Sequence, residues 1–428
     1  MPIPPKPRPT PVSSLARHLQ LADLRGLARL STQATIGVTD ITEGVHRSVL
    51  GTIGLAGSDA QRTGGLSGLV YRAVRGITRG VGRALDTTLA GMEPLLADVD
   101  RRPAEESVQR AAVLAALNGV LGDRLAADRS PFAFNMSLRH RGLPIELGKP
   151  LPVHAPRSRI LLMVHGLCMN DLQWSRIGDD GQVHNHGEAA AAALGHTDLC
   201  LRYNSGRHVW QNGRDLAELL DRLLQHWPVP VEEVSVIAHS MGGLVIRSAV
   251  HQALQQQREW LQRLKQVIFL GTPHHGAPLE RAGRGVDLLL AASPWTAPFS
   301  RLSGVRSAGI TDLRDGRLID EDPRQGRRTP LPLPGGIRWR AIAATLAERR
   351  SAIADRLTGD GLVPLDSALG RDADGAQQLS FADDSTWISP QTGHLALLSR
   401  PDITERIIDW LAESAAPPVP ARTLPDIH

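Results

Sequence analysis

Short apolar runs alternate with longer amphipathic stretches over the larger, C-terminal part of the chain. A continuous apolar run bounded by polar residues is typical of a strand buried on both faces of a parallel sheet. The predicted strands are residues 160–164, 199–203, 234–237, 267–270, 339–344 and 386–388. The stretches between them, such as the leucines from 216 to 224, predict helices. Strands and helices in alternation indicate the α/β class, with a mostly parallel sheet and helices on both faces.

The sheet-forming region is bounded by a hairpin and a terminal helix, and one long segment interrupts it. The hairpin is predicted at 134–147 and the last helix runs from Ile403 to Leu411, so the domain is predicted to span residues 130–413. Residues 277–336 mix leucines and aromatic residues with an arginine- and aspartate-rich loop. Apolar side chains are unusual on an exposed loop, so this insertion is interpreted as a cap or lid. A fixed extra packing layer is the alternative.

A helical N-terminal region, residues 13–127, is predicted to precede this domain. Its most regular helix has apolar residues every three or four positions from Leu66 to Leu85, with arginines on the opposite side. Residues 1–83 carry eleven basic and four acidic side chains, which concentrates positive charge there. One interpretation is that residues 13–90 contact an anionic membrane surface. The other interpretation is a helix packed on its neighbours with its arginines in solvent. This one is favoured because charged outer faces are usual for helices.

Composition adds a few expectations. The proline-rich leader, residues 1–12, lacks the apolar core of a secretory signal, and the tail, residues 414–428, is also predicted to be disordered. No apolar run approaches the ~18 residues of a spanning helix. Two cysteines suit a reducing compartment, so we expect a cytoplasmic protein, with peripheral membrane contact as the alternative. The net charge of +4 is mild, and without a zinc-finger, P-loop or RNA-binding signature no nucleic-acid partner is expected.

One stretch, Ala238-His239-Ser240-Met241-Gly242-Gly243, joins an apolar run to an amphipathic one. It predicts a strand, a sharp turn and a helix, with Ser240 in the turn. Such a turn strains the serine backbone, exposes the hydroxyl above the sheet and requires small residues two positions to either side. Gly242 fits, and Ala238 departs from the usual glycine by one methyl group. The following helix N-terminus would stabilise negative charge beside the hydroxyl, which favours a nucleophile over a chance small-Ser-small turn.

A serine hydroxyl becomes a nucleophile when a base takes its proton. In an open α/β sheet that base is expected from a loop at the carboxyl end of a later strand. His394 follows the last short strand and is predicted as the base for Ser240. His239 precedes the serine but would project away from it, so it is rejected. His274 and His275 are expected to shape the pocket or the turn.

The base needs an acid to hold its tautomer, and the substrate oxygen needs hydrogen-bond donors. Asp360 lies between two glycines beyond the strand at 339–344 and is predicted as the acid. Asp355 and Asp366 are rivals that spacing alone does not exclude. For the oxyanion hole, the N–H of Met241 comes with the turn. The N–H of Leu167, after His-Gly, is predicted as the second donor.

Together these motifs resemble the α/β-hydrolase superfamily. The segments that carry the resemblance are Ala238–Gly243, His165-Gly166, Gly271–Gly276, Gly359–Pro364 and Gly393-His394. They are most similar to lipase-like serine esterases, including bacterial triacylglycerol lipases and the GPI-inositol deacylase group. The resemblance covers about residues 130–413 and implies Ser240 as nucleophile, Asp360 as acid and His394 as base. It also implies Leu167 and Met241 as oxyanion donors, and the single His-Gly-x loop resembles enzymes that act on medium to long acyl chains.

The sequence therefore predicts a serine carboxylic-ester hydrolase that cleaves a hydrophobic acyl ester through an acyl-enzyme, with no cofactor or metal. An acyltransferase with the same triad is one alternative, because the fold does not distinguish water from an alcohol or thiol as acceptor. A membrane-surface adaptor with a vestigial hydrolase domain is another, although the complete set of candidate residues argues against it.

Overall fold

The structure, a computed structural model, divides the chain into two compact units. The first unit comprises Met1–Ser107 with Ala127–Phe132, and the second comprises Val108–Ala126 with Ala133–His428. The described residues are 72–76, 79–80, 83, 107–178, 180–277, 306–321, 328–347, 359–372 and 375–414. The predicted leader, most of the helical N-terminal region and the tail beyond residue 414 therefore lie outside the described residues.

In the first unit, the described residues between 72 and 83 are helical, as the spacing of apolar residues predicts. Val74 is 38% exposed and Arg75 is buried. This is the reverse of the burial that the apolar stripe and its arginine face predict at these two positions. Membrane contact by residues 13–90 stays a prediction. No helix in the described ranges combines the length and the apolar character needed to cross a membrane.

The second unit is built on an eight-stranded sheet with the order β10-β9-β8-β7-β3-β6-β1-β2. Its strands are β1 (Ser137–His140), β2 (Leu143–Ile145), β3 (Arg159–Val164), β6 (Thr197–Arg202), β7 (Glu233–His239), β8 (Leu264–Leu270), β9 (Arg338–Ala344) and β10 (Thr386–Ser389). The first six strands in this order, β10-β9-β8-β7-β3-β6, pair in parallel. The predicted hairpin is β1 with β2, and β1 pairs antiparallel with β6. Every strand predicted from an apolar run is confirmed, with small differences at its ends.

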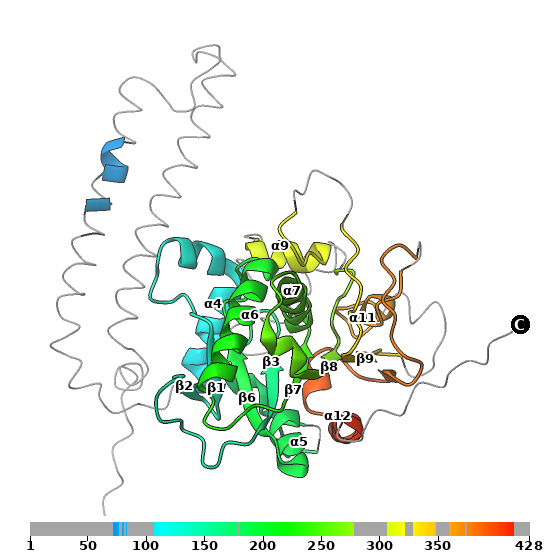
Figure 1. Cartoon of the computed structure of the whole chain (residues 1–428). Helices are drawn as coiled ribbons and strands as arrows, with labels where there is room; N and C mark the ends of the chain where they lie inside the picture. The colour runs from blue at the N-terminus through cyan, green and yellow to red at the C-terminus, as the bar shows by residue number, and fades with distance from the viewer. Residues whose placement is uncertain are drawn as a thin grey trace, which may run out of the picture. The chain divides into compact units, whose positions relative to one another are not determined.

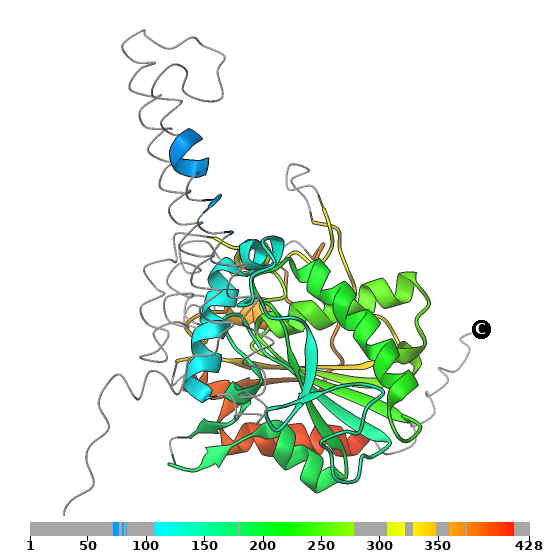
Figure 2. The ribbon, with the colours of Figure 1, turned by 90° about the vertical axis from the view of Figure 1, so that its left-hand side faces the viewer.

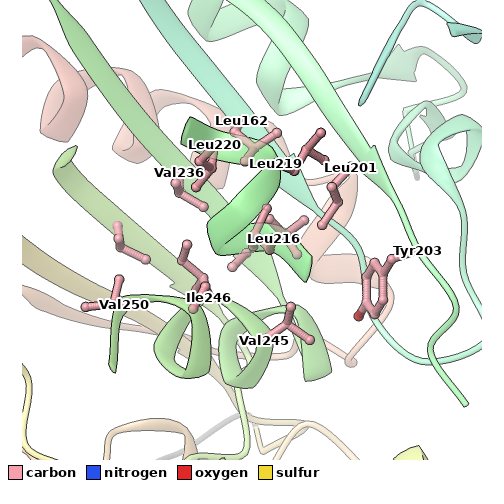
Figure 3. Packing of buried hydrophobic residues seen from close by; sticks show 14 of the residues in the cluster. Leu162, Leu201, Tyr203, Leu216, Leu219, Leu220, Val236, Val245, Ile246 and Val250 are labelled. Carbon is pink, nitrogen blue, oxygen red and sulfur yellow. The ribbon is translucent and has the colours of Figure 1, made fainter. Parts of the chain in front are cut away.

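Helices cover both faces of the sheet, as Figure 2 shows. On one side lie α6 (Val209–His226) and α7 (Met241–Gln255), and on the other lie α5 (His186–Leu194) and α12 (Pro401–Ser414). Successive side chains along a strand point alternately to the two helix layers. Leu162 and Val236 pack against α6 and α7 (Figure 3), whereas Leu161 and Ile237 pack in the cluster that contains Ile403 of α12. This period of two between the layers is what a strand buried on both faces requires.

Helices α4 (Val108–Ala127), α9 (Ala308–Asp315) and the short α11 (Leu365–Ala368) also belong to the second unit, apart from Ala127. Helix α4 contributes Ala116 and Val120 to the same core cluster as α6 and α7 (Figure 1). Sequence analysis placed residues 108–126 with the N-terminal region, whereas the structure groups them with the sheet. Helix α9 lies in the predicted insertion, whose residues 278–305 and 322–327 lie outside the described residues. Ile310 of α9 is buried in the core, and lid motion stays a prediction.

Candidate active site

Ser240 forms the turn between a buried strand and a helix. Strand β7 ends at His239 and helix α7 begins at Met241, which leaves Ser240 alone between them. Its backbone has φ 53° and ψ −124°, a conformation that residues with a side chain rarely adopt. The N–H of Ser240 donates to the carbonyl oxygen of Leu270 at 2.9 Å, which ties the turn to β8. The predicted strand, sharp turn and helix are therefore present, with strain at the serine.

Close backbone approach explains the small residues around this turn. A Cβ atom added at Gly242 would lie 2.3 Å from the carbonyl oxygen of Val164 in β3. One added at Gly166 would lie 3.0 Å from the Cβ atom of Ser240. Ala238 is completely buried within β7, and its methyl group is accommodated there. The turn and the loop after β3 are thus packed against each other, so that glycine is required at 242 and a side chain at 166 would crowd Ser240.

Asp360 and His394 form a buried hydrogen-bonded pair. The Nδ1 atom of His394 lies 2.7 Å from Oδ2 of Asp360, and both side chains are 1% exposed. The second carboxylate oxygen of Asp360 accepts the N–H groups of Leu362 and Val363 at 2.9 and 2.8 Å. The backbone N–H of His394 donates to the carbonyl oxygen of Asp360 at 3.0 Å. A carboxylate on Nδ1 fixes the proton there, which leaves Nε2 of His394 as the proton acceptor.

The local backbone shows why Asp360 occupies this position. Gly359 and Gly361 have φ values of 46° and 93°, so the loop uses left-handed conformations on both sides of the aspartate. The rival Asp366 has a side chain that is 42% exposed, and it forms no bond to the histidine. The other rival, Asp355, lies outside the described residues.

Gly271, at the end of β8, completes the packing around this pair. A Cβ atom there would lie 3.2 Å from Nδ1 of His394. His239, which sequence analysis rejects as the base, donates from Nε2 to the carbonyl oxygen of His394 at 3.2 Å, and the two rings lie 4.7 Å apart. Burial holds the pKa of His239 well below its usual range, so it stays neutral. His239 is thus a packing partner of His394.

Among the described residues, neither the hydroxyl of Ser240 nor Nε2 of His394 has a hydrogen-bond partner. In the described part of the chain, Nε2 of His394 is buried and has no hydrogen-bond partner. No hydrogen bond joins it to the hydroxyl of Ser240 there. Catalytic hydrogen bonds are often long in a free enzyme and tighten when substrate binds. The geometry therefore leaves the basic nitrogen available.

The two predicted oxyanion donors come from the loop after β3 and from the start of α7. Leu167 is completely buried, and among the described residues its N–H has no acceptor. Met241 is the first residue of α7, so its N–H lies outside the helical hydrogen-bond ladder. The next residue in the loop, Cys168, has φ 58°, and its N–H donates to Oγ of Ser205 at 3.1 Å. That bond turns the N–H of Cys168 away from the role of donor to substrate.

His165 lies at the start of the oxyanion loop and is held there by contacts with Tyr203. Its ring stacks on Tyr203 with centroids 4.3 Å apart, and the Tyr203 hydroxyl donates to the carbonyl oxygen of His165 at 2.8 Å. Its Nε2 lies 3.4 Å from the N–H of Tyr203, and its Nδ1 lies 2.8 Å from the carbonyl oxygen of Gly166. Burial lowers the pKa of His165 to about 4, so the ring is neutral near pH 7. A neutral ring fits this pattern, with Nε2 accepting and Nδ1 donating.

Helix α4 contributes to this site, which the sequence did not predict. A Cβ atom at Gly119 would lie 2.2 Å from Sγ of Cys168 and 3.0 Å from its backbone nitrogen. One at Gly122 would lie 1.9 Å from Oδ1 of Asn204. The only sequence signal is a pair of glycines inside an otherwise strong helical pattern. Helix α4 therefore packs directly against the residue that follows the Leu167 donor.

Comparisons with known proteins give a family model and distant structural neighbours. The family model, described as a domain of unknown function (DUF7379), matches residues 143–303. No curated protein matches the chain. Among the described residues, no group of three or more His, Cys, Asp or Glu side chains could hold a metal ion.

The structural neighbours include a lipase and two esterases. The mature lipase BlEst2 of Bacillus licheniformis is 17% identical over 65% of this chain and 97% of its own, with a TM-score of 0.38. The esterase Pf2001 of Pyrococcus furiosus is 14% identical over 60% and 80%, with a TM-score of 0.33. An arylesterase is 10% identical over 66% and 83%, with a TM-score of 0.36.

The second unit has the α/β-hydrolase fold. Its mostly parallel sheet is covered on both faces, and Ser240 lies at the strand-to-helix turn. Asp360 and His394 follow Ser240 in the chain order typical of that fold. The narrower resemblance to triacylglycerol lipases or to the GPI-inositol deacylase group stays a prediction.

Proposed function

We propose that this chain is a serine carboxylic-ester hydrolase that cleaves a hydrophobic acyl ester. The observation that carries the proposal is the pairing of a strained turn serine with a buried Asp360–His394 hydrogen bond whose free nitrogen, Nε2, has no partner in the described residues. A carboxylate-bound imidazole and a turn serine are the parts that acyl transfer through a covalent intermediate needs.

In the first half-reaction, Oγ of Ser240 attacks the ester carbonyl carbon while Nε2 of His394 takes the hydroxyl proton. The carbonyl oxygen becomes an oxyanion, and the N–H groups of Leu167 and Met241 stabilise it. The tetrahedral intermediate collapses, the bond to the alkoxy oxygen breaks, and Nε2 donates its proton to the leaving alcohol. Asp360 stabilises the positive imidazole during both transfers and keeps its own charge.

In the second half-reaction, water replaces the alcohol. Nε2 of His394 takes a proton from water as its oxygen attacks the acyl-enzyme carbonyl. The bond to Oγ of Ser240 then breaks, the proton returns to Oγ, and the carboxylic acid is released. The preference for a hydrophobic acyl group is supported by the leucines of residues 277–336, which occur there together with Trp295 and Phe299.

The decisive experiment replaces Ser240 with alanine in the full chain. Hydrolysis of p-nitrophenyl acyl esters should fall by on the order of 10⁶-fold, as is typical when such a nucleophile is removed. Ser158→Ala is the matched control, because Ser158 precedes β3 at the opposite edge of the sheet and should leave turnover unchanged. Unchanged turnover in Ser240→Ala would refute the proposal. Added alcohols that shift the product from acid to a new ester would make the enzyme an acyltransferase instead.

A further inference from the structure

Arg247 is a buried cation that has no carboxylate partner in the part of the chain that the structure describes. It lies on α7 and is 8% exposed. Its Nη2 donates to the carbonyl oxygen of Leu331 at 2.7 Å, and its Nη1 lies 3.3 Å from Nδ1 of His274. Both acceptors are neutral groups, and no described carboxylate forms an ion pair with this guanidinium. Burial and the nearby Arg328 lower the pKa of Arg247 to about 9, which still leaves it charged near pH 7. An uncompensated buried charge is costly, so the site favours an anion.

His274 is the hydrogen-bond acceptor for one edge of this guanidinium. It lies in the loop after β8 and is 2% exposed. Because a guanidinium has only hydrogen-bond donors, Nδ1 of His274 must accept from Arg247, and the ring proton is then on Nε2. This Nε2–H is buried and has no acceptor among the described residues. The Nε2–H points away from the guanidinium, because the two ring nitrogens face in diverging directions, so Arg247 is the group that would bind an anion here.

A small polar cavity lies beside these two side chains. It has a volume of about 20 Å³, and its lining includes Arg247, His274, Arg317 and Arg328 against a single carboxylate, Glu321. Arg317 is already paired with Asp315 at 3.1 Å. The remaining charge is positive, and the space fits only a small group such as the oxygen atoms of an anion.

An apolar cavity adjoins the polar one. It has a volume of about 160 Å³, and its lining includes Val250, Leu254, Leu333 and Trp339. Arg247 and the residues Leu318 and Leu331 line both cavities. The guanidinium therefore lies where a polar space meets an apolar one, which matches a ligand with one charged end and an aliphatic tail.

The geometry points to a binding site for an aliphatic monocarboxylic acid, with its carboxylate on Arg247 and its chain in the apolar cavity. A planar guanidinium suits a carboxylate, and a single negative charge balances the unpaired cation. None of the lining residues belongs to the set Ser240, Asp360 and His394. The site therefore does not depend on the proposed esterase activity.

Calorimetric titration of the full chain with octanoate tests this site. We expect octanoate to bind at pH 7.5, with octanol and acetate at least about tenfold weaker because each lacks one half of the ligand. Arg247→Met keeps the packing volume and removes the charge, and it should weaken octanoate binding by at least tenfold. His274→Phe, which keeps a ring against Phe269, should also weaken it and serves if Arg247→Met does not fold. Arg214→Met, which removes an exposed guanidinium on α6, is the matched control and should bind like the wild type.

Ser240→Ala separates this site from the proposed catalytic one. It should bind octanoate as the wild type does, whether or not the chain is an esterase. Binding that is lost in Ser240→Ala and kept in Arg247→Met would place the acid at the serine and overturn the inference. Absence of octanoate binding, or inorganic phosphate binding more tightly than octanoate, would overturn it as well.

Discussion

The two loops that flank Ser240 are held in place by different kinds of contact. On the acid–base side, the carboxylate of Asp360 is fixed by backbone N–H groups two and three residues along its own loop. On the oxyanion side, Leu167 lies in a loop fixed by Ser205 and by Gly119 of α4, both distant in sequence. Local hydrogen bonds make the first loop nearly self-sufficient. The second depends on whether a helix from an earlier part of the chain stays docked.

This difference predicts how each side fails. A substitution on the acid–base side should change the chemistry and leave the fold intact, because the loop retains its backbone bonds. A substitution on the oxyanion side should act through position, because the donors are backbone N–H groups that no side-chain change removes. The variants below separate chemistry from position, beginning with the largest expected effect.

The largest effect is expected from Asp360→Asn. An asparagine keeps an oxygen for the N–H groups of Leu362 and Val363, so the loop should fold normally. It no longer holds the proton of His394 on Nδ1, and loss of that tautomer costs about 10⁴-fold in kcat in enzymes with such a triad. Steady-state kinetics with a p-nitrophenyl ester measure this change. The exposed rival provides the control, since Asp366→Asn should keep wild-type kcat, and the opposite result would assign the acid to 366.

The next effect is a pH dependence of stability on the oxyanion side. The pKa of His165 is about 4 in the folded chain against 6.5 for a free histidine, so the unfolded state binds more protons between these values. Stability is therefore complete above pH 6.5 and falls as pH drops toward 4, by about 3 kcal/mol from this residue. Between pH 7.5, 6 and 5, the free energy of unfolding measured in urea should fall more steeply for the wild type than for His165→Gln. Equal slopes would contradict a neutral, buried His165.

Gly119→Ala tests the dependence of the oxyanion loop on α4. Alanine favours helix over glycine by about 1 kcal/mol, so any loss must come from the contact with Cys168. Displacing one oxyanion donor costs about 10²-fold in kcat, and we expect a loss of that order with a small change in KM. Gly335→Ala is the matched control, because a Cβ atom there meets nothing within 4 Å. Wild-type kcat in Gly119→Ala would show that α4 does not position the loop.

The same contrast explains what the sequence could reveal. Each of the six parallel strands was predictable because an apolar run is a local signal. Gly242 and the two glycines beside Asp360 likewise mark crowded or left-handed backbone locally. The contact of Gly119 with Cys168 has no such signal, because a glycine carries no side-chain chemistry and its partner is distant in the chain. For the same reason α4 was assigned to the N-terminal region. Only three-dimensional packing shows that it belongs beside the sheet.

Some choices needed hydrogen-bond geometry. Spacing left Asp360 with two rivals, and the bond to Nδ1 of His394 distinguishes it from Asp366. Arg247 could not be recognised in advance, because an arginine on a helix usually faces solvent. Its burial depends on Leu331 and His274, which reach it from other parts of the chain.

The smallest effect is expected from Tyr203→Phe, which removes a single atom from the support of the oxyanion loop. Phenylalanine keeps the ring stacked on His165, and only the hydrogen bond to the His165 carbonyl oxygen is lost. A buried carbonyl left without its donor costs about 1–3 kcal/mol of stability, whereas the packing by Gly119 still holds the loop. We therefore expect a lower urea midpoint and a kcat reduced by less than about tenfold. If Tyr203→Phe lowered kcat more than Gly119→Ala, the loop would be positioned chiefly by this hydrogen bond, and the docking of α4 would be secondary.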